Sequence, residues 1–324
     1  MSKKRLISGI QPSGALHIGN YFGAIKQFVD LQNDYDTSVF IADLHAITTV
    51  HNKKTLSENT LAVAMDYLAC GLDPEKVILF KQSDIPEVTE LTWYFNCLTT
   101  MPFLERATSY KDAHMKAKEV TVGLFDYPIL MASDILIQDA DVVPVGQDQK
   151  QHIEYARDVA QKFNNTFGDV FKLPEAMILD NVAIVPGTDG RKMSKSYGNT
   201  IPLFGTDEEI KKAVMSIVTD SKTPEESKDP DECNVFALHK LFLNANDLKE
   251  LRNRYTNGGL GYKESKEMLL SEIISFVTPL RSRRKRYEEN PAIVREILSQ
   301  GKNKIRALID KKISIIRESV GINL

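Results

Sequence analysis

The sequence contains few cysteines, and their scarcity excludes several kinds of site. Only Cys70, Cys97 and Cys233 occur among 324 residues. A small odd number of this kind argues against a disulfide framework and fits a reducing cytosol. The wide spacing leaves no CxxC pair, and the six histidines form no HExxH pattern, so we expect no structural metal.

Long apolar runs are also missing. The longest candidate, 127–137, is interrupted by Pro128 and Asp134, whereas a membrane helix needs about 18 apolar residues. The basic start of the chain precedes only the short apolar segment 6–10, and a signal peptide needs about 7–15 apolar residues. The sequence therefore predicts a cytoplasmic protein that has no membrane partner.

Positive charge is not in excess. Lysines and arginines number 41 against 44 acids, which gives a net charge of −3 and a pI near 6.1. Contact with RNA would therefore need a local basic patch. One lies at 281–286, and further cations follow at Lys302, Lys304, Arg306, Lys311 and Lys312. The pattern leaves two interpretations open, contact with RNA phosphates or a solvated helix face.

Strand-like and helical segments alternate in the first part of the chain. Short buried strands are expected at 6–9, 37–42, 77–81, 142–145 and 182–185, and helical patterns between them at 21–32, 56–70, 87–98 and 150–163. Alternation of this kind predicts an α/β fold, a Rossmann-like doubly wound parallel sheet with right-handed crossovers. Ligands of such sheets bind beyond the carboxyl ends of the strands.

After residue 200 the pattern becomes helical. Thr206 is an expected N-cap, followed by acidic residues that open a helix through 218. The polar segment 223–232 contains two prolines and predicts a surface loop. We therefore expect two domains, a Rossmann-like domain over 1–200 and a smaller all-helical domain over 201–324, whose last helix returns to the sheet.

The segment 11–20, QPSGALHIGN, joins a predicted strand to a predicted helix. Gly14 and Gly19 allow a close approach of backbone or ligand, and Pro12 fixes the turn. His17 and Asn20 offer hydrogen bonds. A strand, a glycine turn and a helix N-terminus can bind phosphate, although an ordinary glycine turn before a helix has the same pattern.

The segment 192–196, KMSKS, places Lys192 and Lys195 around a serine in a predicted loop. The preceding turn, 186–191, would act as a hinge. Two such lysines could move onto a polyphosphate when the loop closes. A merely solvated basic loop is the alternative.

Two further segments lie where ligands are expected. In 127–136, YPILMASDIL, the residues Tyr127, Met131 and Asp134 share one helix face. A buried carboxylate is costly without a donor, which either the protein or a ligand must supply. In 145–152, VGQDQKQH, a strand ends and a helix begins, which predicts either a ligand-binding edge or a polar cap.

These segments, in this order, resemble the motifs of a known enzyme family. HIGN and KMSKS are similar to the paired HIGH and KMSKS motifs of class I aminoacyl-tRNA synthetases. With SGIQPSG, YPxLMAxDIL and PVGxDQKQH, the chain resembles the tryptophanyl-tRNA synthetases of the bacterial type from about residue 6 to the C-terminal helices. Tyrosyl-tRNA synthetases resemble it in fold, but they have a glutamine where this chain has Met131. Because a site built for a phenol hydroxyl loses much when that hydroxyl is unpaired, Met131 favours an indole.

The resemblance implies a set of site residues. It assigns catalysis to His17, Lys192 and Lys195, and ATP binding to Gln11, Pro12, Ser13, Gly19, Asn20, Gly146, Gln147, Asp148, Ile184 (or Val185 as second choice), Lys192, Met193, Ser194, Lys195 and Ser196. It assigns tryptophan binding to Asp134, Tyr127, Met131, Gln149 and His45. The usual KxKS string after the glutamate–arginine pair is absent here, and Lys111 or Lys116 would substitute for its lysine.

The resemblance also implies the reaction and the partners. It predicts a ligase that uses ATP with Mg²⁺, held mainly by the phosphates, to activate L-tryptophan and charge tRNA(Trp), and that forms a homodimer. Some related enzymes carry an iron–sulfur site, which Cys233 alone cannot build. Two alternatives stay open: a tyrosine-specific sibling, and a non-catalytic paralogue that binds RNA.

Overall fold

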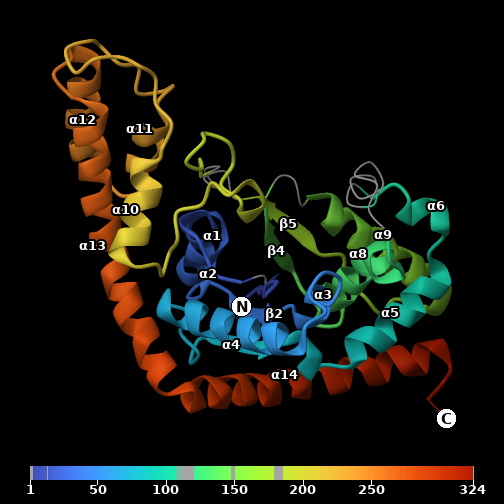
Figure 1. The fold of residues 1–324 in the computed structure, drawn as a ribbon. Helices are drawn as coiled ribbons and strands as arrows, with labels where there is room; N and C mark the ends of the chain where they lie inside the picture. The colour runs from blue at the N-terminus through green and yellow to red at the C-terminus, as the bar shows by residue number, and fades with distance from the viewer. Residues whose placement is uncertain are drawn as a thin grey trace.

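The computed structural model describes residues 3–12, 14–107, 110, 120–146, 150–178 and 185–323. A five-stranded sheet lies at its centre (Figure 1). Its strands are β1 (Arg5–Ile10), β2 (Asp36–Ile41), β3 (Val77–Lys81), β4 (Val142–Val145) and β5 (Glu175–Ile178). The order is β3-β2-β1-β4-β5, and every pairing is parallel. The predicted α/β fold class is therefore confirmed.

Four of the five strands were predicted from the sequence, and β5 was not. β5 pairs with β4 in the register Val142 to Glu175. It is short, begins with an exposed glutamate and contains one β-branched residue, Ile178, so its pattern is weak. Of the strand expected at 182–185, only Val185 lies within the described residues, and it belongs to no strand.

Helices cover both faces of the sheet. The first part of the chain contains α1 (Ile18–Asn20), a π-helical turn (Tyr21–Ile25), α2 (Lys26–Leu31), α3 (Asp43–Ala46), α4 (Lys53–Ala69), α5 (Glu87–Leu98), α6 (Met101–Leu104), α8 (Val122–Leu136) and α9 (Lys150–Phe167). Side chains alternate along β2, so that Val39 and Ile41 enter one hydrophobic cluster and Phe40 the other. Two cores result, one on each face of the sheet.

The segment after the sheet is helical, as expected. It contains α10 (Asp207–Met215), α11 (Asn234–His239), α12 (Ala245–Asn257), α13 (Tyr262–Glu289) and α14 (Pro291–Val320). Thr206 caps α10: its Oγ1 accepts the Glu209 N–H at 3.2 Å, and Glu209 Oε2 accepts the Thr206 N–H at 2.8 Å. α10 ends at Met215 rather than 218. In Figure 1, α10 to α13 form an arm that projects from the sheet region.

α14 leaves the arm and runs along the sheet region (Figure 1). Arg306 bonds Glu87 at 2.8 Å, and Arg317 bonds Glu90 at 2.6 Å. Lys312 is buried, and its Nζ donates to Asp139 Oδ1 at 2.5 Å and to the Val170 carbonyl at 2.7 Å. Lys312 is therefore used inside the fold, and its proposed availability to RNA was wrong.

The basic run 281–286 also serves the fold. Arg283 Nε donates to the Ala69 carbonyl at 2.7 Å, and Arg284 Nε donates to the buried Asp66 at 2.5 Å. Arg281 donates to the Gly205 carbonyl at 3.0 Å. These three arginines join α13 to α4 and to the segment before α10. The sequence left two interpretations of this run open, contact with RNA phosphates or a solvated helix face. Neither describes these arginines, because both assumed cations directed away from the protein.

Candidate active site

The two motifs that lie far apart in the sequence are in contact in the structure. The Gly19 N–H donates to Met193 Sδ at 3.3 Å, and Lys195 Nζ donates to the Gly14 carbonyl at 3.0 Å. Behind them the Ile18 N–H donates to the Ile201 carbonyl at 3.0 Å. The turn 14–20 and the loop 192–203 therefore form one wall. The family resemblance assigns residues of both segments to the ATP site, and the structure brings the two segments into contact.

His17 occupies the position before α1. Its backbone N–H donates to Asn20 Oδ1 at 3.1 Å, and its ring is buried. Burial, and secondly the charge of Lys195, lower the pKa of His17 to about 4. The imidazole is therefore uncharged near neutral pH and retains one N–H donor.

The lysine-bearing loop is held by Asn199, a residue that no motif in the sequence indicated. Asn199 is buried, and its Oδ1 accepts the Ser194 N–H at 2.8 Å. Its Nδ2 donates to Asp189 Oδ1 at 2.6 Å and to the Lys192 carbonyl at 3.1 Å. One side chain thus holds the start of the loop, at Lys192 and Ser194, together with the preceding turn at Asp189. An asparagine after a glycine is typical of any turn, so the sequence contained no specific signal for this role.

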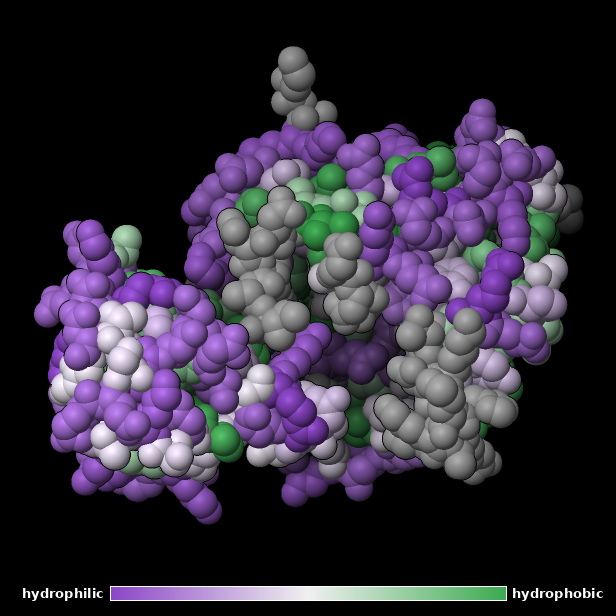
Figure 2. Space-filling view, turned by 90° about the horizontal axis from the view of Figure 1, so that it is seen from above, coloured by the Kyte–Doolittle hydropathy of each residue, from purple (hydrophilic) through white to green (hydrophobic). Residues whose placement is uncertain are grey.

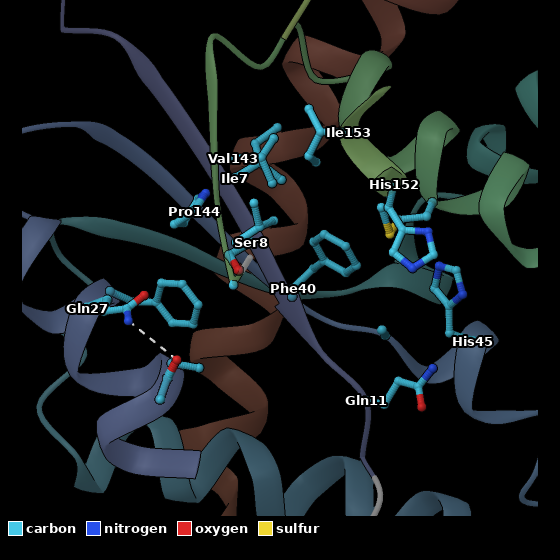
Figure 3. Close-up of a pocket in the computed structure, with 18 of the residues that line it drawn as sticks. Ile7, Ser8, Gln11, Gln27, Phe40, His45, Val143, Pro144, His152 and Ile153 are labelled. Carbon is cyan, nitrogen blue, oxygen red and sulfur yellow. Dashed lines mark hydrogen bonds between the residues drawn. The ribbon is translucent and has the colours of Figure 1, made fainter. Parts of the chain in front are cut away.

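A cavity of about 1180 Å³ lies at the carboxyl ends of the strands. Predicted residues that line it are Gln11, Gly19, His45, Tyr127, Met131, Gly146, Lys192 and Met193, together with the second choice Val185. Figure 3 shows His45 and His152 together at one end of the cavity and Gln27 at the other. Seen from above, this face is hollowed near its centre, among largely hydrophilic side chains (Figure 2).

The remaining predicted residues are placed differently. Several are among the described residues but do not line the cavity: Pro12, His17, Asn20, Asp134, Ser194, Lys195 and Ser196. Others lie outside the described residues: Ser13, Lys111, Lys116, Gln147, Asp148, Gln149 and Ile184.

The cavity end near His45 is apolar and aromatic. Ile7, Phe40 and Val143 add apolar side chains to the wall of the cavity. The ring centroids of His45 and Tyr127 are 6.1 Å apart, and those of Tyr127 and His152 are 5.7 Å apart. A flat aromatic group of similar size would bury its faces against such walls.

Asp134 lies behind His45 and is only 2% exposed. Its Oδ2 accepts His45 Nε2 at 3.0 Å, and Gln82 Nε2 approaches Oδ1 at 2.9 Å and Oδ2 at 2.8 Å. Burial raises the pKa of Asp134, while the hydrogen bonds from His45 and Gln82 oppose that rise. The protein itself therefore supplies donors for the buried carboxylate. Since a carboxylate has about four acceptor positions, capacity for a ligand donor remains.

The site shows no metal-binding cluster among the residues that the structure describes. In that part of the chain no group of three or more His, Cys, Asp or Glu side chains could hold a metal ion. The three cysteines are free. No helix within the described ranges is both long enough and apolar enough to cross a membrane.

Comparison with known proteins identifies the family. The model for "tRNA synthetases class I (W and Y)" matches residues 2–278. A tryptophan–tRNA ligase of Fusobacterium nucleatum is 52% identical over 320 residues, which covers 98% of each chain. The crystal structure of Campylobacter jejuni tryptophanyl-tRNA synthetase complexed with ADP and tryptophan matches with a TM-score of 0.92 and 47% identity, covering 98% of this chain and 99% of that one. A tyrosyl-tRNA synthetase of Archaeoglobus fulgidus, at 20% identity and a TM-score of 0.69, shares the fold. This chain therefore belongs to the class I tRNA synthetases for tryptophan and tyrosine, and within them to the tryptophanyl-tRNA synthetases of the bacterial type.

Proposed function

We infer that this protein is an ATP-dependent tryptophan–tRNA ligase. A tryptophan carboxylate oxygen forms a bond to the α-phosphorus of ATP while the bond to the bridging oxygen breaks, and pyrophosphate leaves. A terminal ribose hydroxyl of tRNA(Trp) then takes the tryptophanyl group from the adenylate. One observation carries this conclusion: the turn 14–20 and the loop 192–203 are joined by direct hydrogen bonds beside a cavity with an aromatic end.

The nucleotide belongs at the wall formed by these two segments. Lys192 and Lys195 would neutralise the charge that develops on the departing pyrophosphate, and His17 would donate to an oxygen of the α-phosphate. Because no acidic cluster occurs in the described part of the site, we propose that Mg²⁺ enters with ATP and is held mainly by the phosphates.

Tryptophan belongs at the aromatic end of the cavity. Tyr127 and Met131 line that end, and Asp134 lies one helical turn further along α8, behind His45. The carboxylate would accept the indole N–H, and the apolar wall would bury the ring. Gln149 would contact the amino-acid end of the substrate, as the family resemblance implies.

The test is ATP–pyrophosphate exchange with each amino acid in turn. The proposed function predicts exchange with tryptophan and little with tyrosine. Exchange with tyrosine instead would identify the tyrosine-specific sibling. Absence of exchange with every amino acid would leave the non-catalytic RNA-binding paralogue.

Asp134→Ala is expected to raise the KM for tryptophan by about 10–100-fold, because a hydrogen bond to a charged group is lost. The KM for ATP should change by no more than about twofold, since Asp134 bonds His45 and Gln82 and its removal leaves the contacts between the turn 14–20 and the loop 192–203 intact. Exchange kinetics with each substrate varied separately measure both constants. An unchanged KM for tryptophan would refute the role given to Asp134.

We propose that the anticodon side of the tRNA contacts the helical region 201–324. Lys302, Lys304 and Lys311 are exposed on α14, unlike the buried Lys312, and phosphate contacts need only local charge of this kind.

We propose the cytoplasm as the site of action, in keeping with the three free cysteines.

We propose that the protein is a homodimer that buries an apolar patch on α5, α6 and α8. Trp93 is 67% exposed, Met101 62% and Val122 81%, and both α5 and α6 contact α8. Large apolar side chains exposed on neighbouring helices are typical of interaction sites where they form one patch. A stable dimer would bury roughly 1,200–2,000 Å² in total.

Trp93→Glu is expected to convert the dimer to a monomer, because each copy would place a charge in the apolar interface. Light scattering after size exclusion should give about twice 36.5 kDa for the unmodified protein and about 36.5 kDa for the variant. Ile293→Glu, which changes an exposed isoleucine on α14, is the matched control and should remain dimeric. A dimeric Trp93→Glu variant would place the interface elsewhere.

A further inference from the structure

Gln82 connects three separate parts of the tryptophan end of the cavity. It is 1% exposed and lies in a short 3₁₀ turn (Gln82–Asp84) directly after β3. Its Oε1 accepts the backbone N–H groups of Leu44 at 3.1 Å and His45 at 3.2 Å. Its Nε2 donates to both oxygens of Asp134, at 2.9 and 2.8 Å. The side chain thus links β3, α3 and α8.

These contacts determine the orientation of the amide. Because Oε1 faces two N–H donors, the NH₂ group must face Asp134, and a flipped amide would direct its oxygen at the carboxylate. The same side chain fixes the position of α3, which carries His45. Gln82 therefore orients the Asp134 carboxylate and also holds His45, which lies between that carboxylate and the cavity.

The charge state of Asp134 determines which ligand group it can bind. An ionised carboxylate only accepts hydrogen bonds, whereas a protonated one presents an O–H donor that competes with a ligand N–H. Burial raises the pKa of Asp134, and the hydrogen bond from Gln82 is one of the contacts that lower it. Without Gln82, the acid would lose both a constraint on its orientation and part of the stabilisation of its charge.

We propose that Gln82 is a positioning residue for recognition of the ring N–H of the amino acid: it holds Asp134 as an oriented acceptor and His45 at the cavity wall. This inference rests on the proposed activation of tryptophan and specifies the chemistry that the site selects. Removal of Gln82 should weaken selection of an indole N–H over an isosteric ring without that donor.

A purely structural role makes a different prediction, and Gln32 provides the comparison. Gln32 is also buried, and its Nε2 donates to the Val29 carbonyl at 2.9 Å and to the Gly71 carbonyl at 3.3 Å. Its Oε1 accepts the Asp73 N–H at 2.9 Å. Gln32 bonds three backbone groups but does not line the cavity, and none of these bonds involves Asp134. Gln32→Met therefore reports the effect of losing a buried structural amide.

The experiment compares tryptophan with β-(3-benzothienyl)alanine, in which sulfur replaces the ring N–H, in ATP–pyrophosphate exchange. The unmodified protein should prefer tryptophan. In Gln82→Met, the ratio of the two kcat/KM values should fall about tenfold or more, through the KM for tryptophan, because a hydrogen bond to a charged acceptor is worth at least that factor. In Gln32→Met, the ratio should stay within about twofold of that of the unmodified protein, because no contact with Asp134 is lost.

Gln82→Glu covers the case in which Gln82→Met fails to fold. A carboxylate can still accept the N–H groups of Leu44 and His45, but it directs an acceptor at Asp134 instead of a donor. The ratio should fall in this variant as well. An unchanged ratio in the Gln82 variants, an equal fall in Gln32→Met, or no preference in the unmodified protein would overturn the inference.

The outcomes also separate this inference from the proposed function. If the unmodified protein catalyses no exchange with tryptophan, the proposed function fails and the inference falls with it. If it catalyses exchange with tryptophan and the Gln82 variants keep its selectivity, only the role of Gln82 is wrong.

Discussion

Lys195→Ala is expected to lower kcat for tryptophan-dependent pyrophosphate exchange by about 10²–10³-fold, the usual cost of removing one preorganised group that stabilises transition-state charge. Lys195 Nζ lies 3.0 Å from the Gly14 carbonyl, directly over the turn that precedes His17. In the proposed function this cation would neutralise the charge that develops on the departing pyrophosphate. Because the side chain is at the surface, the free energy of unfolding should change by less than about 0.5 kcal/mol.

Two control variants show whether the charge of Lys195 or only its bulk is responsible for the expected effect on kcat. Lys195→Arg keeps the positive charge and should retain part of the activity, although its planar group cannot copy the compact ammonium. Lys263→Ala removes a lysine that is 81% exposed at the start of α13 and should leave kcat unchanged. A Lys195→Ala variant with unaltered kcat would show that the contact between the two motifs serves the fold alone.

Gly301→Ala is expected to destabilise the protein by about 3 kcal/mol, near the upper end of the cost of overpacking a filled site. α14 crosses β3 so closely at this point that an added Cβ would lie 1.8 Å from the Leu79 carbonyl oxygen and 2.7 Å from its carbon. Both groups belong to the backbone, so neither can rotate away. The helix would have to separate from the edge strand of the sheet.

Gly123→Ala is the matched control, measured in the same denaturant titration. Gly123 also lies in a helix, α8, but a Cβ there would meet only the Thr48 methyl group at 3.9 Å. That change should be neutral or slightly stabilising, because alanine favours a helix over glycine by about 1 kcal/mol. Equal stability of the two variants would contradict the close packing of α14 on β3.

Local pattern was sufficient where a segment has one strong periodicity. The strands at β1 to β4 are short apolar runs between turn residues, and the capped start of α10 follows from Thr206 and Glu209. The single helix face of Tyr127, Met131 and Asp134 was also predictable, because helical spacing alone determines it. β5 lacked such a pattern and depends on its pairing with β4.

The side-chain contacts that hold the site residues in place were beyond prediction from this single sequence. Gln82 and Asn199 are polar residues in turns, where glutamine and asparagine usually face solvent, and only the assembled fold places them against Asp134 and the Lys192 loop. Charge was a misleading guide to surface exposure for the same reason. Arg284 and Lys312 look like surface cations in the sequence, but Asp66 and Asp139 lie where their helices dock.

The most direct test is a crystal structure of the protein with ATP and tryptophan bound. It should show the phosphates between the turn 14–20 and the two lysines of the loop, with the indole nitrogen within hydrogen-bond distance of a buried acid on α8. The proposed function depends on one site, formed jointly by the turn 14–20, the loop 192–203 and α8. Nucleotide bound elsewhere, or an indole ring directed away from that acid, would contradict it.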